Sequence, residues 1–260
     1  MFFIGDILKK EVVIQINNLS YLYNNKPVLD KVSCSINQGD FVTILGSNGV
    51  GKTTLLKCIA RQHAVKENSI FIRQKDICKY RQKEYAGIVG YLPQKTSFNL
   101  PYTVKELLKL SGYPYSKEGI NEDMLTQAIE MFKLEHLQDR RINSLSGGEC
   151  QKLMLASVFV QNTDIICLDE PFSFLDPTQC ESILNILEDL FYKRNKTIII
   201  VLHNLNNIYF SNIYKDAKAI LLKNREIFFN GQLAEAVKSF EEFYSRSFTT
   251  FSKDDMEFKF

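Results

Sequence analysis

The stretch Phe41-Val42-Thr43-Ile44-Leu45-Gly46-Ser47-Asn48-Gly49-Val50-Gly51-Lys52-Thr53-Thr54 decides the fold. Its first five residues predict a buried strand, its glycines open a loop, and the run from Leu55 to Ala60 predicts a helix. This is the P-loop pattern in its required strand–loop–helix context. Glycines let backbone N–H groups curl around phosphate oxygens, and the next helix presents its positive N-terminal end. We therefore expect Gly46 to Thr54 to bind nucleotide phosphates, with Lys52 at the β- and γ-phosphates and the Thr53 hydroxyl on Mg²⁺.

A second apolar run, Ile165 to Leu168, ends in Asp169 and Glu170. Parallel α/β sheets place their sites at the C-terminal ends of strands, where the P-loop also lies. Asp169 can hold Mg²⁺, and Glu170 can polarise an attacking water. The alternative is that two adjacent acids cap a helix.

The order of the elements predicts an α/β fold. A right-handed crossover is expected where Asp176-Pro177 caps a helix between two apolar strands. The runs at 41, 165 and 197 are apolar on both faces, as in a covered parallel sheet. The predicted strands are 12–16, 41–45, 88–92, 165–168 and 197–202.

The stretch from about 96 to 156 has helical spacing, at Thr103 to Leu110 and Glu122 to Leu134, without a convincing strand. After residue 217, two strands are expected on either side of Asn224-Arg225, and Asn230-Gly231 is expected to close the second. Arg225 is an awkward residue for a positive φ, so a longer loop is the alternative to a tight hairpin.

The composition excludes several classes of protein. The chain has 260 residues, 45% hydrophobic and 24% charged, which excludes disordered, collagen-like and disulfide-scaffold proteins. The formal net charge of +2 gives no reason to expect nucleic-acid binding. No apolar run reaches the ~18 to 20 residues of a membrane span. The six cysteines form no close pair, and no secretory signal is recognised, so a cytoplasmic, reducing compartment is expected.

The pentapeptide Leu145-Ser146-Gly147-Gly148-Glu149 narrows the class, because a P-loop with an acidic strand end also occurs in kinases and GTPases. Alone it is typical of a serine N-cap followed by flexible glycines. Combined with the P-loop, Gln94, Asp176 and His203, it resembles the signature of the ATP-binding subunits of ABC transporters, over about Val12 to Leu233.

The resemblance implies a P-loop NTPase core, a parallel sheet with an antiparallel β subdomain, plus an inserted α-helical subdomain. In these terms 11–95 and 157–233 form the nucleotide-binding core, 96–156 the helical subdomain with the signature, and 234–260 a C-terminal helix and tail. It implies an ATPase using ATP and Mg²⁺, with Lys52, Glu170 and His203 as catalytic residues. Two subunits would pair head to tail, so that Ser146, Gly147, Gly148 and Glu149 of each close on the ATP held by the other.

Four further matches are individually weak. Gln94 resembles the glutamine that senses Mg²⁺ and the γ-phosphate, and His203 the histidine that contacts the γ-phosphate. Asp176 resembles the dimer-interface loop, and Tyr23 the aromatic that stacks on adenine, with Tyr21 as the competing choice. The plainer readings are surface loop, structural histidine, helix cap and core tyrosine.

Four positions depart from the family pattern. They leave the phosphate, metal and water ligands in place, so a working ATPase is still expected. They are Cys150, Ser157, Phe172 and Asn204.

Local features resemble the branch that energises uptake of iron–siderophore, haem or cobalamin complexes. They are Glu149 and the segments 92–94, 103–107, 112–115 and 203–206. Zinc and manganese importers share several of them, so an importer of those metals is an alternative.

The resemblance implies transmembrane permease subunits as partners and, indirectly, a substrate-binding protein, which places the chain peripherally at the cytoplasmic face of the inner membrane. We expect the permease to dock beside Gln94, on a surface that includes Thr96, Phe98, Leu100 and Tyr102.

The competing hypotheses are a non-transport ABC ATPase acting on DNA or ribosomes, a nucleotide-gated binding module, and a P-loop kinase. Heptads and a second P-loop are lacking, Glu170 and His203 argue for turnover, and no kinase acceptor site was found.

Overall fold

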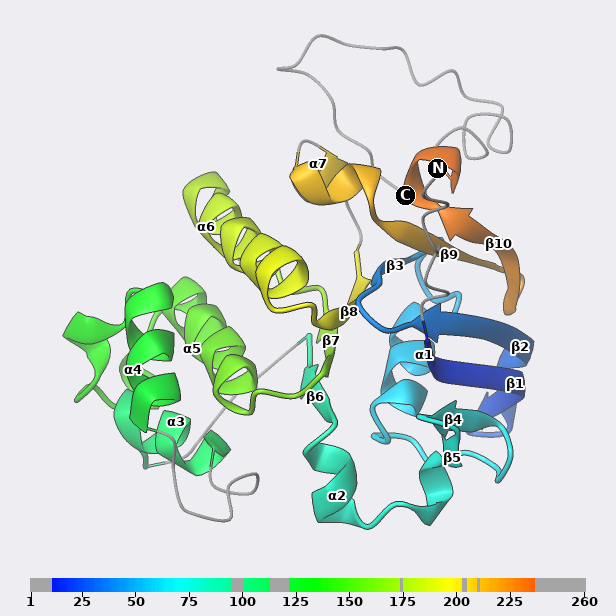
Figure 1. Cartoon of the computed structure of the whole chain (residues 1–260), viewed down its shortest axis with the longest axis horizontal. Coiled ribbons are helices and arrows are strands. Elements are labelled where there is room, and N and C mark those ends of the chain that lie inside the picture. The colour runs from blue at the N-terminus through cyan, green and yellow to red at the C-terminus, as the bar shows by residue number, and fades with distance from the viewer. Residues whose placement is uncertain are drawn as a thin grey trace, which may run out of the picture.

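Two β-sheets organise the computed structural model, which describes residues 11–94, 101–112, 122–173, 175–202, 205–209 and 211–236 (Figure 1). One is antiparallel, in the order β2-β1-β4-β5, and the other has six strands in the order β10-β9-β3-β8-β7-β6. The strands are β1 Val12–Tyr23, β2 Lys26–Asn37, β3 Phe41–Leu45, β4 Ile70–Ile72, β5 Lys75–Asp76, β6 Val89–Leu92, β7 Ile165–Asp169, β8 Thr197–Val201, β9 Lys218–Lys223 and β10 Glu226–Gln232.

The helices lie on both sides of the six-stranded sheet, and Figure 1 shows α3, α4 and α5 grouped away from the antiparallel sheet. The α-helices are α1 Lys52–Ile59, α2 Gln82–Ala86, α3 Val104–Gly112, α4 Glu122–Met131, α5 Gly147–Val160, α6 Pro177–Glu188 and α7 Asn206–Tyr209. Short 3₁₀ turns occur at Ile77–Lys79, Glu135–Leu137, Ile142–Ser144 and Asn212–Lys215, and a π-helical turn, Asp189–Lys193, continues α6. Within the described ranges, no helix has the length and apolar character needed to cross a bilayer.

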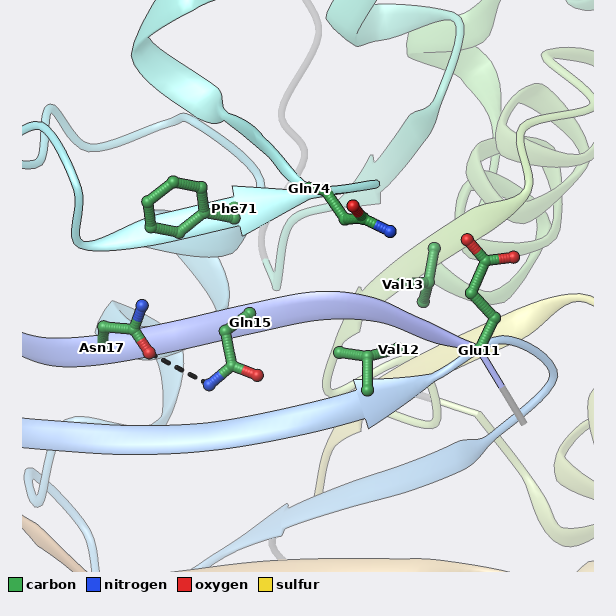
Figure 2. A pocket seen from close by; sticks show the side chains of 7 residues that line it. All are labelled: Glu11, Val12, Val13, Gln15, Asn17, Phe71 and Gln74. Atoms are coloured by element: carbon green, nitrogen blue, oxygen red, sulfur yellow. Dashed lines mark hydrogen bonds between the residues drawn. The ribbon is translucent and has the colours of Figure 1, made fainter. Parts of the chain in front are cut away.

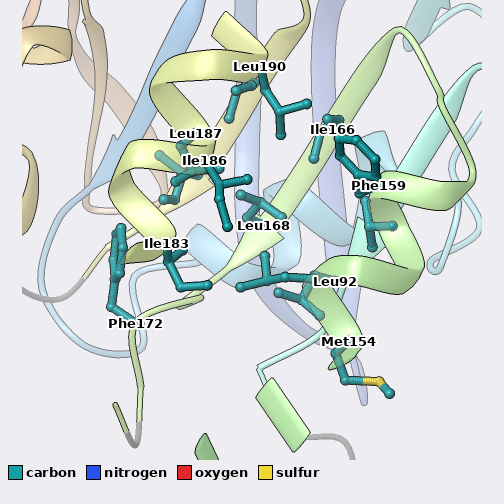
Figure 3. Close-up of a cluster of buried hydrophobic side chains, with 14 of the residues drawn as sticks. Leu92, Met154, Phe159, Ile166, Leu168, Phe172, Ile183, Ile186, Leu187 and Leu190 are labelled. Atoms are coloured by element: carbon teal, nitrogen blue, oxygen red, sulfur yellow. The ribbon is translucent and has the colours of Figure 1, made fainter. Parts of the chain in front are cut away.

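The central strands β3, β7 and β8 of the six-stranded sheet are buried on both faces because two separate cores lie against them. In β8, Ile198 and Ile200 face a core shared with α5 and α6, whereas Ile199 and Val201 face a core shared with α1 and the antiparallel sheet. Successive side chains of a strand point to opposite faces, which produces this division. Figure 3 shows the first core, where side chains of α5 and α6 meet those of β7.

The predicted α/β fold is confirmed, with parallel pairing across β9, β3, β8, β7 and β6. All five predicted strands are present, although β1 extends beyond the predicted end at Ile16. The strand continues because bulges take up Asn17 and Asn18, whose polar side chains hid the pattern. The Asn18 N–H donates to Ser33 Oγ of the neighbouring strand at 2.8 Å.

The helix predicted after Asp176-Pro177 is α6. The Asp176 carboxylate accepts a hydrogen bond from the Gln179 N–H at 2.8 Å, and Pro177 opens the helix. The helical patterns near 103–110 and 122–134 are α3 and α4.

Two predictions about the C-terminal hairpin are corrected. The alternative of a longer loop at Asn224-Arg225 is wrong, since these two residues alone join β9 to β10 with φ of 50° and 75°. Positive φ values at both residues fit the twist of a two-residue hairpin. The Arg225 carbonyl oxygen accepts a hydrogen bond from the Asp30 N–H at 2.9 Å. Asn230-Gly231 does not close the second strand, because both residues pair with β9 inside β10.

Candidate nucleotide-binding site

The loop between β3 and α1 turns through glycines that no other residue would replace easily. Gly46, Gly49 and Gly51 have φ of 139°, 75° and 112°, and only glycine adopts such values without strain. A β-carbon at Gly46 would lie 2.5 Å from the Leu222 carbonyl oxygen, and one at Gly51 would lie 2.8 Å from Leu29 Cδ2. The loop is therefore a cradle of backbone that side chains would fill.

Lys52 lies inside this loop and is 5% exposed. Its Nζ donates to the carbonyl oxygens of Gly46 at 2.7 Å and Ser47 at 3.1 Å. Burial lowers the pKa of Lys52, and the negative charges of Glu170 and Asp169 oppose that shift. A charged phosphate oxygen is a stronger acceptor for this ammonium than either carbonyl.

Thr53 and Asp169 bring two oxygen donors together at the ends of neighbouring elements. The Thr53 hydroxyl donates to Asp169 Oδ1 at 3.0 Å, and Asp169 is fully buried at the end of β7. A hydroxyl and a carboxylate beside a phosphate cradle form the hard oxygen set that Mg²⁺ prefers. The residues present therefore fit a magnesium–nucleotide complex.

Glu170 follows Asp169 with a left-handed backbone, φ 51°, which is strained for a residue other than glycine. Its N–H donates to the Val201 carbonyl oxygen at 3.1 Å, which ties it to β8. Its carboxylate accepts from Gln94 Nε2 at 2.6 Å and from the Ser173 hydroxyl at 3.3 Å. The structure thus brings together Gln94 and Glu170, which are 76 residues apart in the sequence.

Three residues at this site were missed by the sequence patterns. Ser173 lies three residues after Glu170, and this short spacing in the sequence could have indicated that its hydroxyl reaches the Glu170 carboxylate. The Tyr91 hydroxyl is buried without a hydrogen-bond partner among the described residues, and burial, with the nearby charge of Asp169, raises the pKa of Tyr91. Gln151 is a buried amide in α5, and its Nε2 donates to the Pro171 carbonyl oxygen at 3.0 Å.

The signature residues begin α5. Ser146 caps the helix: its hydroxyl accepts from the Glu149 N–H at 3.3 Å, and its own N–H donates to Glu149 Oε2 at 2.7 Å. The Ser146 N–H holds the pKa of Glu149 below its ordinary value, assisted by Arg140. Ser146 and Gly147 are exposed, whereas a β-carbon at Gly148 would lie 2.6 Å from Gln179 Oε1.

Tyr23, Asp176 and Tyr102 are described by the structure, and the other remaining predictions fall outside the described residues. Tyr23 is 59% exposed near the end of β1, whereas Tyr21 stacks on His63 with ring centroids 4.8 Å apart. Asp176 is an exposed helix cap. On the expected docking surface, Tyr102 is 37% exposed. The predictions for Thr96, Phe98, Leu100, 113–115, His203, Asn204 and the tail beyond 236 lie outside the described residues.

The described part of the chain also has cavities away from this cluster. A groove of about 380 Å³ runs along the antiparallel sheet between Val12 and Phe71, and within it Gln15 Nε2 donates to Asn17 Oδ1 at 3.0 Å (Figure 2). A second, of about 570 Å³, lies beside the ion pair of Asp40 and Lys218. Neither lining includes a predicted site residue from the described part of the chain.

The sequence of this chain is similar to a protein family and to several known proteins. A family model described as ABC transporter matches residues 29–173, more than half of the chain. The petrobactin import ATP-binding protein YclP of Bacillus subtilis is 34% identical over 89% of this chain and 92% of its own length. A probable siderophore transport ATP-binding protein, YusV, from the same organism is 38% identical over 74% and 72%. The zinc import ATP-binding protein ZnuC of Ehrlichia chaffeensis is 34% identical over 87% and 86%.

A solved structure is similar in fold. It is a dimeric ATP-binding cassette in a post-hydrolysis state, bound to ADP and phosphate. It is 25% identical and covers 85% of this chain and 98% of its own, with a TM-score of 0.71.

Proposed function

This chain belongs to the ABC transporter family, and on that premise we propose that it hydrolyses ATP to energise import of an iron–siderophore or similar metal chelate. ATP-binding cassettes of this family are ATPases, and the relatives above include ATP-binding subunits of importers. The observation that carries the proposal is the Gln94–Glu170 contact beside Lys52 and the Thr53–Asp169 pair. It gathers phosphate-binding, metal-binding and water-polarising groups at one edge of the sheet.

The roles of the phosphate-binding residues follow from their chemistry. The backbone of 46–51 would hold the β- and γ-phosphates, and Lys52 would exchange its two carbonyl acceptors for phosphate oxygens. Thr53 and Asp169, with Gln94, would hold Mg²⁺, which when bound neutralises charge on the β- and γ-phosphates. Tyr23 would stack on the adenine.

Glu170 is the proposed residue for polarising the attacking water. Two donors, Gln94 and Ser173, fix its carboxylate, and such anchoring sets the direction in which a carboxylate accepts a proton. His203 would assist at the γ-phosphate. Hydrolysis at this site would then depend on a carboxylate that its neighbours hold in place.

The exposed signature is the proposed contact with a second copy of the chain. Ser146 to Glu149 would close on ATP held by the partner, with Asp176 at the same interface. The segment 96–156 would act as the helical subdomain and dock permease subunits near Gln94, at the cytoplasmic face of the inner membrane. The remaining divisions of the chain, 11–95 with 157–233 as core and 234–260 as C-terminal helix and tail, are proposed on the same basis.

The variant Glu170→Gln tests the catalytic assignment. It keeps the shape of the side chain and removes the base, so turnover should fall by ~10² or more. ATP binding and ATP-dependent dimers should persist, which analytical ultracentrifugation measures. A Glu170→Gln protein that hydrolyses ATP at the wild-type rate refutes the role of Glu170.

The cargo is proposed from the two relatives whose names specify petrobactin and siderophore transport. The zinc import relative, with an identity of 34%, supports zinc as a second candidate. Transport specificity depends on the permease, so the test is ATP hydrolysis by this chain reconstituted with a candidate permease and binding protein. Stimulation by a ferric siderophore supports the first cargo, and stimulation by zinc alone supports the second.

A further inference from the structure

Gln151 connects two functional segments of the chain. It lies in α5, two residues after the signature, is 6% exposed, and donates from Nε2 to the Pro171 carbonyl oxygen at 3.0 Å. Pro171 is buried too and directly follows Glu170. The hydrogen bond therefore joins the helix of the signature to the peptide unit next to the proposed catalytic carboxylate.

The turn at Glu170 needs external support because its backbone is left-handed. On one side, the Glu170 N–H is held by the Val201 carbonyl oxygen, and the Ser173 N–H donates to the Glu170 carbonyl oxygen at 3.1 Å. Pro171 has no N–H, so its carbonyl is the backbone polar group through which this residue can be held. Gln151 occupies that acceptor.

Removing the amide would leave a buried carbonyl without this donor, which is costly. The turn could recover hydration by opening, and Glu170 would move with it. The side chain of Phe172 gives the turn a second, apolar anchor, since it is 9% exposed and lies next to Ile183 of α6 (Figure 3). Phe172 retains the turn as a whole, whereas Gln151 fixes the orientation of its backbone.

The first turns of α5 touch several parts of the site at once. Ser146 caps α5 at the signature. Gly148 lies against the side chain of Gln179, which is in the first turn of α6, the helix that Asp176 caps. One turn later, Gln151 reaches Pro171. A rigid helix therefore carries both the signature and the donor that supports Glu170.

We propose that Gln151 is a positioning residue for Glu170, through which the placement of the signature helix sets the geometry of the catalytic turn. This inference rests on the proposed role of Glu170 in hydrolysis. The effect of Gln151 on Glu170 passes through the Pro171 carbonyl oxygen, to which its Nε2 donates.

The test is a double-mutant cycle on the full-length protein. Gln151→Met keeps the approximate volume and removes the donor, and Gln82→Met, at an exposed position of α2, is the matched control. At saturating MgATP, Gln151→Met should lower kcat by ~10-fold, because one well-oriented hydrogen bond controls the carboxylate. The dissociation constant of a fluorescent ATP analogue should stay within ~2-fold.

The same substitution is then made in the Glu170→Gln background, with residual hydrolysis followed by radiolabelled ATP. Since the carboxylate to be positioned is gone, Gln151→Met should change the residual rate by less than ~2-fold. An equal ~10-fold loss in both backgrounds, or no loss in the wild-type background, overturns the proposal. Wild-type turnover by Glu170→Gln itself refutes the proposed function instead, so the two failures are distinguished.

Thermal unfolding and circular dichroism establish that each variant is folded. If Gln151→Met is not, Gln151→Leu takes its place, since it also removes the donor and puts no charge beside the Pro171 carbonyl oxygen. The same two rate comparisons then decide for or against the proposal.

Discussion

The P-loop and the signature are both glycine-containing segments that lead into a helix, yet they are built differently. The P-loop glycines 46, 49 and 51 have left-handed or related φ values, and a buried lysine fills the loop. The signature glycines 147 and 148 are not among the positive-φ glycines. Ser146 and Gly147 are exposed, and an acid, Glu149, lies in the first helical turn.

The two segments supply different shares of a phosphate-binding site. The P-loop combines curled backbone, a cation and a nearby pair of oxygens, those of Thr53 and Asp169, that are proposed to bind metal. At the signature, two N–H groups of the helix start, those of Ser146 and Glu149, are engaged inside the capping box. The signature is therefore expected to act only against a nucleotide that another surface already holds.

The largest expected loss of turnover comes from a substitution in the P-loop. Lys52→Met removes the buried cation, and turnover should fall by ~10³ or more, because charge stabilisation of the transferred phosphoryl group is lost. Binding of a fluorescent ATP analogue should weaken as well. The control is Lys57→Met in the last turn of the same helix, and wild-type turnover in Lys52→Met would contradict the comparison.

A smaller but more selective effect is expected at the signature. Ser146→Asp keeps a helix cap but places a negative charge where the partner's phosphates would lie, so turnover should fall by ~10². ATP binding to the single subunit should be unchanged, while ATP-dependent dimers disappear in analytical ultracentrifugation. Ser144→Asp, at an exposed position two residues earlier, should retain dimers. If Ser146→Asp weakens binding to the monomer, the signature contacts nucleotide of its own chain.

The third prediction concerns adenine. Tyr23→Ala should raise the dissociation constant of ATP by ~10-fold, since stacking of an aromatic ring on a base contributes about 1–3 kcal/mol. Tyr21→Ala should instead lower the midpoint of thermal unfolding, because Tyr21 stacks on His63. The reverse result would assign adenine to Tyr21.

The smallest prediction is a pH effect at the signature. The Ser146 N–H and Arg140 hold the pKa of Glu149 below 4.5, so the ionised carboxylate stabilises the folded state. That contribution is complete above pH 4.5 and is lost as the pH falls through the lower folded-state value. Glu149→Gln should lower the free energy of unfolding by less than about 1 kcal/mol at pH 7, and the difference should vanish in acid. Urea titrations at several pH values measure it, and a pH-independent difference would exclude ionisation as its origin.

The sequence predicts this fold well where the signal is local. The run 41–54 specifies strand, loop and helix through adjacent residues, and Asp176-Pro177 specifies a helix start in the same way. The pattern fails where partners are distant: β1 continues past Ile16 only because bulged pairing with β2 accommodates Asn17 and Asn18.

The residues of the site also differ in whether neighbouring residues or distant partners identify them. The P-loop and the acids 169–170 are recognisable from neighbouring residues, and their roles remain predictions. Gln151 could not be assigned to the site from its helix, since its partner Pro171 lies across the fold. Likewise, the two-residue turn at Asn224-Arg225 was obscured because arginine rarely adopts a positive φ.

The left-handed backbone of Glu170 has an evolutionary consequence. Glycine adopts that conformation freely, so Glu170→Gly would relieve strain of about 1 kcal/mol or more while destroying the proposed water-polarising group. The backbone conformation and the proposed role in turnover therefore favour different residues at this position. In a lineage that kept the cassette but lost its transporter, this glutamate is among the first residues expected to drift.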